Sequence, residues 1–132
     1  MMIDDLFINT FQTALKNDIV IKDIDFDDEN IRFLTYNLYS VYSQTYTYNI
    51  DFNDFIIIDG YNNTKKQQQI VKRLAKLIIK YKNYAKNNIA KFIEYYNNIQ
   101  HKIFNLKYNF DVIAKMDKIL GNNRYYIKNM ED

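Results

Sequence analysis

The chain has 132 residues, a length typical of one domain with its own hydrophobic core. Its hydrophobic fraction of 48% excludes an intrinsically disordered protein, and its apolar runs are too short to cross a bilayer. The lack of cysteine excludes disulfides, iron–sulfur clusters and cysteine-ligated zinc. Because no secretory signal follows the first residues, we expect a cytoplasmic protein with no membrane partner.

The net charge of +2 hides two halves of opposite sign. Residues 1–64 hold 11 acidic and 3 basic side chains, whereas residues 65–132 hold 5 acidic and 15 basic ones. Between Asp59 and Glu94 there are nine basic residues and no acidic one. A charge division of this size favours a polyanionic partner or a docking surface.

The acidic half begins with a predicted helix and a predicted strand. Ile3–Lys16 places apolar residues at helical spacing, with two aspartates in the first turn. Ile19–Phe26 is β-branched and alternating, which predicts a short strand or an extended connection. Asp27–Asn30 offers capping groups for a second helix. The apolar face of that second helix would be formed by Ile31, Leu34, Leu38, Val41 and Thr45.

A β-hairpin is predicted next. Tyr46–Asn53 alternates between apolar and polar residues, the clearest strand pattern in the chain. Phe55–Ile58 is a second β-type run, and Asn53 with Asp54 can make a tight turn between the two strands. Asp59 and Gly60 then end the hairpin.

The basic half predicts long helices. Asn62, Asn63 and Thr64 offer an N-cap, and one apolar stripe continues from Val71 to Leu106. No Gly or Pro interrupts Tyr61–Leu120, yet helices in globular proteins are usually shorter than this. We therefore expect bends at Asn87–Asn88 or Asn97–Asn98. A last helix over Phe110–Leu120 would end at Gly121.

Together these elements predict an α+β fold that is mostly helical. It would contain amphipathic helices, one small antiparallel hairpin and a long basic helix or helical hairpin. We expect a single domain over residues 1–132. It would comprise an acidic α/β half (1–64), a basic helical half (65–121) and a tail (122–132).

Six of the nine bases share one face of the long helix, opposite the apolar stripe. We call this set the basic ridge: Lys65, Lys66, Lys72, Arg73, Lys76 and Lys80. Such a row neutralises phosphates and gives an affinity that falls steeply with salt. Nearby aromatic side chains can stack on bases. They are Tyr81, Tyr84, Tyr95 and Tyr96.

Two other interpretations of the basic ridge stay open. A long helix commonly presents a solvated lysine face, although this leaves the absence of any Glu at helical pairing distance unexplained. Alternatively, the acidic half docks on the basic ridge, within one chain or between copies, which would set orientation more than stability.

The sequence predicts no catalytic residues, cofactor or bound metal. Asp23, Asp25 and Asp27 match the first ligands of a calcium loop, but Asp28 and Leu34 stand where its glycine and glutamate are needed. A generic magnesium site in this acidic segment stays an alternative.

The other residues considered for catalysis or ligand binding also lack the neighbouring groups that such a site needs. His101 is the only histidine and is interpreted as a surface or interface residue. Gly60 and Gly121 are isolated, which excludes a phosphate-binding loop or a dinucleotide motif. We expect a protein that is not an enzyme by itself.

The excess of Asn, Ile, Tyr, Lys and Asp, the length and the lack of catalytic motifs resemble the small proteins of yeast cytoplasmic linear killer plasmids. Among these, the chain is similar to the small subunit of their virus-like RNA polymerase. The resemblance implies a non-catalytic accessory subunit of a DNA-dependent RNA polymerase or transcription complex, docked on a larger subunit beside nucleic acid. It assigns no individual residue.

The alternative is a protein-interaction module without nucleic acid, such as a viral helical inhibitor of host signalling. Poxvirus inhibitors with a Bcl-2-like helical fold share the same compositional bias. This chain lacks their Asn-Trp-Gly-Arg signature and contains a predicted hairpin.

Overall fold

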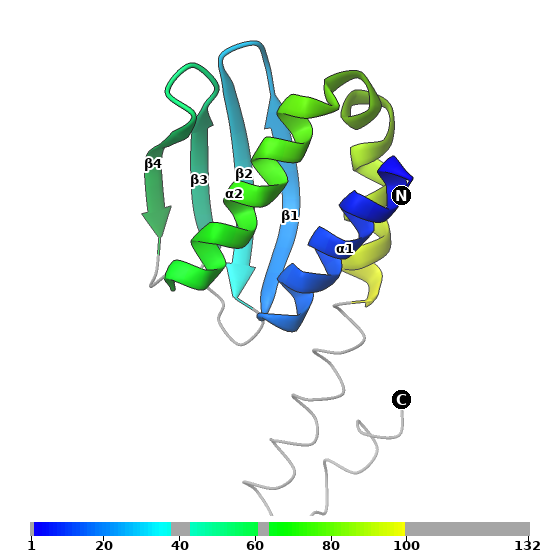
Figure 1. Cartoon of the computed structure of the whole chain (residues 1–132). Helices are drawn as coiled ribbons and strands as arrows, with labels where there is room; N and C mark the ends of the chain where they lie inside the picture. Colours follow the sequence, from blue (N-terminus) through cyan, green and yellow to red (C-terminus); the bar gives the residue numbers. More distant parts are fainter. Residues whose placement is uncertain (1, 38–42, 61–63, 100–132) are drawn as a thin grey trace, which may run out of the picture. The chain divides into compact units, whose positions relative to one another are not determined.

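The computed structural model describes residues 2–37, 43–60 and 64–99 (Figure 1). The described residues up to Asn98 belong to one compact unit. Its elements in chain order are α1 (Ile3–Lys16), β1 (Ile19–Phe26), β2 (Asn30–Asn37), β3 (Ser43–Asn49), β4 (Asp54–Gly60), α2 (Lys65–Lys80) and a third helix over residues 82–99. His101, the predicted helix over Phe110–Leu120 and the predicted tail lie outside the described residues, so the expectation of a single domain over 1–132 stays a prediction.

The four strands form one antiparallel sheet in the order β1-β2-β3-β4. Each strand therefore pairs with its neighbour in the sequence, which leaves β1 and β4 as the two edges of the sheet. Both edge strands carry a bulge, because Lys22 in β1 and Ile56 in β4 are extra residues relative to the facing strand.

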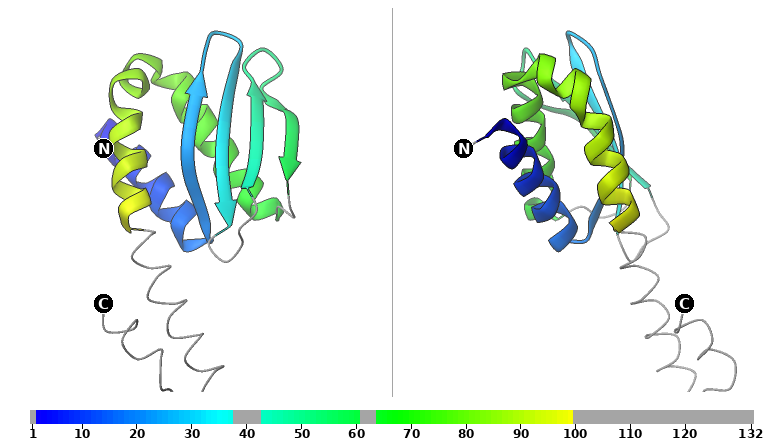
Figure 2. Two further views of the ribbon diagram at one scale, coloured as in Figure 1. Left: turned by 180° about the vertical axis from the view of Figure 1, so that it is seen from behind. Right: turned by 90° about the vertical axis from the view of Figure 1, so that its right-hand side faces the viewer.

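The helices lie against one face of this sheet. Figure 2 shows α1 and α2 on the same face, with the third helix running beside β1. Successive side chains of a strand point to opposite faces, so alternate residues enter the core. The side chains that β2 and β3 bury almost completely under the helices are Ile31, Phe33, Thr35, Tyr46 and Tyr48.

Aromatic rings join α1 to the third helix. Phe92 stacks on both Phe7 and Phe11, with ring centroids 5.9 Å apart in each pair. Tyr96 stacks on Phe11 at 5.4 Å. All four rings are buried, so these contacts fix the third helix beside the first.

The predicted fold class is wrong in its central feature. A four-stranded antiparallel sheet, covered by helices, replaces the mostly helical chain with one small hairpin. The helix expected after Asn30 is strand β2 instead, and Thr45 belongs to β3. Leu38 and Val41, which were placed on that helix, lie outside the described residues.

The error arose because two periodicities fit the same residues. Ile31 and Leu34 match a helical stripe, but Ile31, Phe33 and Thr35 also alternate with a period of two. The structure buries the second set, and Phe33 faces Tyr46 across the strand pair. Asp27 caps a turn rather than a helix, since its carboxylate accepts hydrogen bonds from the Glu29 and Asn30 amides at 2.8 Å.

The predicted hairpin is present, but the strand predicted over Tyr46–Asn53 is displaced, because residues 50–53 form the turn. Strand β3 ends at Asn49, and β4 begins at Asp54. The chain reverses between them with Asn53 at φ 54°, and the Asn49 side chain accepts a hydrogen bond from the Phe52 amide at 2.9 Å. Tyr46 and Tyr48 are both buried on one face, as the alternation indicates, whereas Phe52, which the same alternation places with them, is 76% exposed in the turn.

The long helical region does not break where it was expected to. Residues 82–99 are helical through Asn87–Asn88 and Asn97–Asn98, whereas α2 ends at Lys80 and the chain turns at Tyr81. Tyr81 has φ −122° and ψ 53°, outside the helical region. The turn lets the third helix pack against α1, and no sequence breaker marks it.

Candidate nucleic-acid interface

The local sequence of α2 fixes which of its sides faces solvent. Thr64 starts the helix with a capping box, in which its hydroxyl accepts from the Gln67 amide at 3.0 Å and the Gln67 side chain accepts from the Thr64 amide at 3.2 Å. The apolar stripe of α2 then packs on the other elements through buried side chains. These are Ile70, Val71, Leu74, Ala75 and Ile78.

The basic ridge lies on the opposite side of α2. Five of its members are exposed, and none of the five forms an ion pair with another described residue: Lys65, Lys66, Arg73, Lys76 and Lys80. The sixth member, Lys72, is half-buried. The structure therefore brings the predicted residues together on one solvent-facing side of a single helix.

Lys72 is where the basic ridge meets the acidic half. Its ammonium group lies 3.1 Å from a carboxylate oxygen of Asp54, at the start of β4. The pKa of Asp54 is lowered, first by a hydrogen bond from the Phe55 amide and then by Lys72, with a further contribution from Lys76. One carboxylate thus contacts one member of the ridge, and the five exposed members form no close ion pair with another described residue.

The three remaining bases of the acid-free run lie on the third helix and have other neighbours. Lys82 forms an ion pair with Asp28. Lys86 lies close enough to contribute to the lowered pKa of Asp28. Lys91 lies over the Phe92 ring, 5.3 Å from its centroid. These three are separate from the basic ridge, as the helical spacing indicated.

The tyrosines proposed for base stacking divide into two groups. Tyr84 packs against Phe7, with ring centroids 5.4 Å apart, and Tyr96 is buried against Phe11. Tyr95 is 59% exposed, and half-buried Tyr81 lies under the Lys80 ammonium group at 5.4 Å. Tyr95 is therefore the most exposed of the four, Tyr81 and Tyr84 are both half-buried, and Tyr96 is buried.

The acidic segment Asp23–Glu29 covers the end of β1 and the turn that leads into β2. Arg32 pairs with Asp25 at 2.9 Å and with Asp27 at 3.1 Å. No group of three or more acidic or histidine side chains among the described residues is arranged to hold a metal ion. The carboxylates of Asp25, Asp27 and Asp28 therefore pair with protein cations, and those of Asp23 and Asp27 accept hydrogen bonds from backbone amides.

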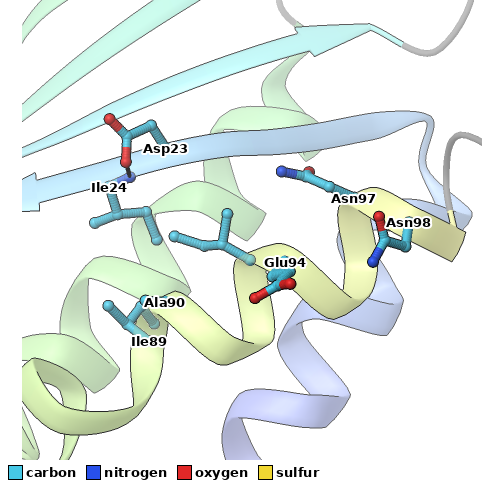
Figure 3. Close-up of a pocket in the computed structure, with 8 residues that line it drawn as sticks. Asp23, Ile24, Ile89, Ala90, Glu94, Asn97 and Asn98 are labelled. Carbon is cyan, nitrogen blue, oxygen red and sulfur yellow. Dashed lines mark hydrogen bonds between the residues drawn. The ribbon is translucent and has the colours of Figure 1, made fainter.

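A pocket of about 410 Å³ lies between β1 and the third helix. It contains the carboxylates of Asp23 and Glu94. Figure 3 shows Asp23 on β1, beside Ile24, and Glu94 on the third helix. Asp23 instead accepts a hydrogen bond from the Ile24 amide at 2.9 Å, so the two acids do not act as a pair.

Sequence reasoning missed one prominent surface, the exposed edge of β4. The run Phe55–Ile58 was predicted as a strand. Its place at the edge of a four-stranded sheet could not be predicted, because the residues of β2 were assigned to a helix. The apolar run between Asp54 and Asp59 was the available signal.

Comparison of the chain with protein-family models, with curated proteins and with solved structures found no match. Among the described residues, none of the helices has the length and apolar character needed to cross a lipid bilayer.

Proposed function

We propose that this protein is a non-catalytic accessory subunit that attaches to nucleic acid through phosphates bound along the basic ridge. The observation that carries the proposal is the row of exposed, unpaired bases on the solvent side of α2. From Lys65 to Lys80 this row is about 22 Å long at about 1.5 Å per residue. That length matches about six successive phosphates of one strand at about 3.4 Å each.

Binding of this kind depends on charge and does not distinguish base sequences. Lysine and arginine contacts to phosphate give affinity and position, whereas specificity requires contacts to base edges. Exposed Tyr95 and half-buried Tyr81 can add stacking on unpaired bases. In the transcription complex implied by the resemblance, a larger subunit would supply the catalysis and this chain would hold the template or transcript.

The proposal is tested by removing charge from the exposed ridge without disturbing the Lys72–Asp54 pair. The triple variant Lys65→Gln, Arg73→Gln and Lys76→Gln should weaken binding to labelled single-stranded and double-stranded oligonucleotides alike. The slope of log K against log salt should become shallower by roughly two to three, because each lost phosphate contact contributes about 0.7–0.9. Fluorescence anisotropy over a salt series measures both quantities.

The matched control removes three positive charges elsewhere. Lys16, Lys22 and Lys91 are exposed and lie off the ridge, so their change to Gln should leave the salt slope nearly unchanged. Equal losses in the two triple variants would show that net charge, and not the basic ridge, carries the affinity. No binding by the unmodified chain at low salt would refute the proposal.

The interaction module without nucleic acid makes a different prediction for the same ridge. In that case an acidic protein surface occupies α2, and the Lys72–Asp54 contact is a small example of such pairing. Affinity purification from the native source separates the two functions. Recovery of polymerase subunits supports the accessory subunit, whereas recovery of a signalling protein supports the module.

A further inference from the structure

A hollow of about 480 Å³ lies between α1 and the third helix, and we call it the aromatic pocket. Sites for small ligands have volumes of about 300–1,000 Å³, so its size is sufficient for one. Side chains four residues apart on a helix lie on the same side, and the pocket is built from three such pairs. One pair comes from α1 and two come from the third helix: Ile8 and Gln12, Lys91 and Tyr95, and Phe92 and Tyr96.

Aromatic rings form the inner part of this pocket. Phe92 and Tyr96 are buried, and both stack on the Phe11 ring of α1. Tyr95 is 59% exposed and meets Tyr96 edge to face, with ring centroids 5.0 Å apart and ring planes at 87°. The buried rings thus hold Tyr96 in place, and Tyr95 presents an exposed ring on which a flat aromatic ligand can stack.

The charge of the aromatic pocket distinguishes it from two other hollows of the molecule. Carboxylates line both of those, namely Asp23 with Glu94 beside the third helix and Asp23 with Asp25 on the sheet. Among the described residues that line the aromatic pocket, none is acidic, and Lys91 is the one charged residue. Because a nucleic-acid strand carries phosphates beside its bases, carboxylates around a base would repel it. Of these three hollows, the aromatic pocket is therefore the one whose charge suits nucleic acid.

We propose that the aromatic pocket binds one unpaired nucleobase of a nucleic-acid strand, stacked on the Tyr95 ring. The Lys91 ammonium group and the Gln12 amide supply hydrogen-bond donors for the carbonyl oxygens and ring nitrogens at the edge of a base. Gln12 also forms a hydrogen bond with the Tyr96 hydroxyl, which holds the amide at the pocket. Because every base has a π-face, the pocket accepts bases with little sequence preference.

This inference rests on the proposed function and adds a preference for single strands. The bases of a duplex are paired and stacked on their neighbours, so a base enters the pocket from unpaired strand or after costly extrusion. The phosphates that the basic ridge binds are present in single strands and duplexes alike. A ligand with unpaired bases, such as a transcript or an opened template, therefore gains a contact that a duplex lacks.

One strand is long enough to reach both surfaces. A strand of about 20 nucleotides extends to about 68 Å, at about 3.4 Å for each nucleotide. The unit that contains both the basic ridge and the aromatic pocket ends at Asn98, and a unit of this length has a radius of gyration of about 13 Å. A strand of this length is therefore suitable for the test.

Fluorescence anisotropy of the full chain, at one fixed low salt concentration, compares this strand with an abasic strand of equal length. The abasic strand keeps the phosphates and lacks the bases. The unmodified chain should bind the strand with bases at least about tenfold more tightly. Tyr95→Ala should lower this ratio about tenfold, because stacking of one base is lost, and should leave the affinity for the abasic strand unchanged. Tyr95→Phe keeps the ring and should keep the ratio.

Phe52→Ala is the matched control, because it removes a ring that is 76% exposed in the turn before β4. It should leave the ratio unchanged. Circular dichroism verifies folding, and Tyr95→Leu, which keeps an apolar side chain without a ring, should lower the ratio in the same direction if Tyr95→Ala fails to fold.

Three results would overturn the base pocket and leave phosphate binding by the basic ridge intact. They are a ratio near one for the unmodified chain, a ratio insensitive to Tyr95→Ala, and an equal loss in Phe52→Ala. Binding of neither strand at low salt would overturn both the base pocket and the proposed function.

Discussion

The two edges of the sheet are built in opposite ways. β1 has charged residues, a bulge at Lys22 and a helix alongside that bonds to its backbone. β4 also has a bulge, but its three isoleucines stay exposed. Among the described residues, the β1 edge is therefore covered by a helix, whereas the β4 edge is not. β4 is exposed because it lies at the edge that no described helix covers. The rest of the sheet, by contrast, is covered by helices on one face.

The two edges also depend on different parts of the chain. Protection of β1 comes from residues 82–98, far away in the sequence, through aromatic packing on α1. β4 contacts α2 through the exposed pair Asp54–Lys72. Disturbing the aromatic cluster should thus affect the β1 edge first, while changes on β4 should leave the β1 edge largely unaffected.

The largest effect is expected from Phe92→Ala. Phe92 is 7% exposed and stacks on Phe7 and Phe11. Removal of a buried phenyl ring leaves a cavity and should lower the free energy of unfolding by about 3–5 kcal/mol. Urea denaturation measures this change. Native-state hydrogen exchange should accelerate more in β1 than in β4, because the third helix covers β1.

Phe52→Ala is the control, since it removes the same side chain where it is 76% exposed, in the turn before β4. Its effect should stay within about 0.5 kcal/mol. Similar destabilisation by both variants, or equal acceleration of exchange in β1 and β4, would show that the third helix does not protect one edge selectively.

An intermediate effect is expected from Gly60→Ala at the end of β4. Gly60 has φ 123°, and an added Cβ would lie 2.6 Å from the Ser43 carbonyl oxygen and 2.8 Å from the Gln44 Cα. Both neighbours are backbone atoms, so the β3–β4 pair must shift. We expect a loss of about 1–3 kcal/mol in the free energy of unfolding.

Asp59→Ala is the matched control for Gly60→Ala, because Asp59 is an exposed neighbour on the same strand and its φ is not positive. Thermal and urea unfolding should show a change within about 0.5 kcal/mol. If Gly60→Ala lowered the free energy of unfolding as little as Asp59→Ala, the positive φ at residue 60 would not be needed to keep β4 paired with β3.

The sequence predicted well those features that depend on nearby residues. The bounds of α1, the strand Ile19–Phe26 and the Thr64 cap are confirmed, because caps and short-range periodicity act within a turn or a strand. The common face of the basic ridge followed from helical spacing for the same reason. Its role in binding nucleic acid stays a proposal.

The features that were missed depend on residues distant in the sequence. Whether Ile31 and Leu34 belong to a helix or a strand is decided by pairing with β1 and β3. The turn at Tyr81 is decided by packing of the third helix on α1, since neither Gly nor Pro marks it. Exposure of β4 requires the strand order of the whole sheet, which no local pattern contains.

The smallest effect is expected at the hairpin that joins the protected edge to β2. The pKa of Asp27 is lowered from 3.8 to about 2, mainly by hydrogen bonds from the Asn30 and Glu29 amides and then by Arg32. A folded-state pKa below the unfolded one means that ionised Asp27 stabilises the fold above pH 3.8, and that this contribution disappears as the pH falls towards about 2.

Asp27→Asn keeps an acceptor for the two amides but removes the charge that attracts Arg32. We therefore expect the free energy of unfolding of the variant to lie below that of the unmodified chain at neutral pH, with a difference that shrinks as the pH falls from 3.8 towards about 2. Urea unfolding at a series of pH values measures this difference. Asp51→Asn in the β3–β4 turn is the control for removal of one exposed carboxylate, because the Asp51 carboxylate makes no hydrogen bond or ion pair with another described residue. A pH-independent difference for Asp27→Asn would show that this carboxylate does not hold the β1–β2 hairpin through its charge, and the protected edge would then depend on the third helix alone.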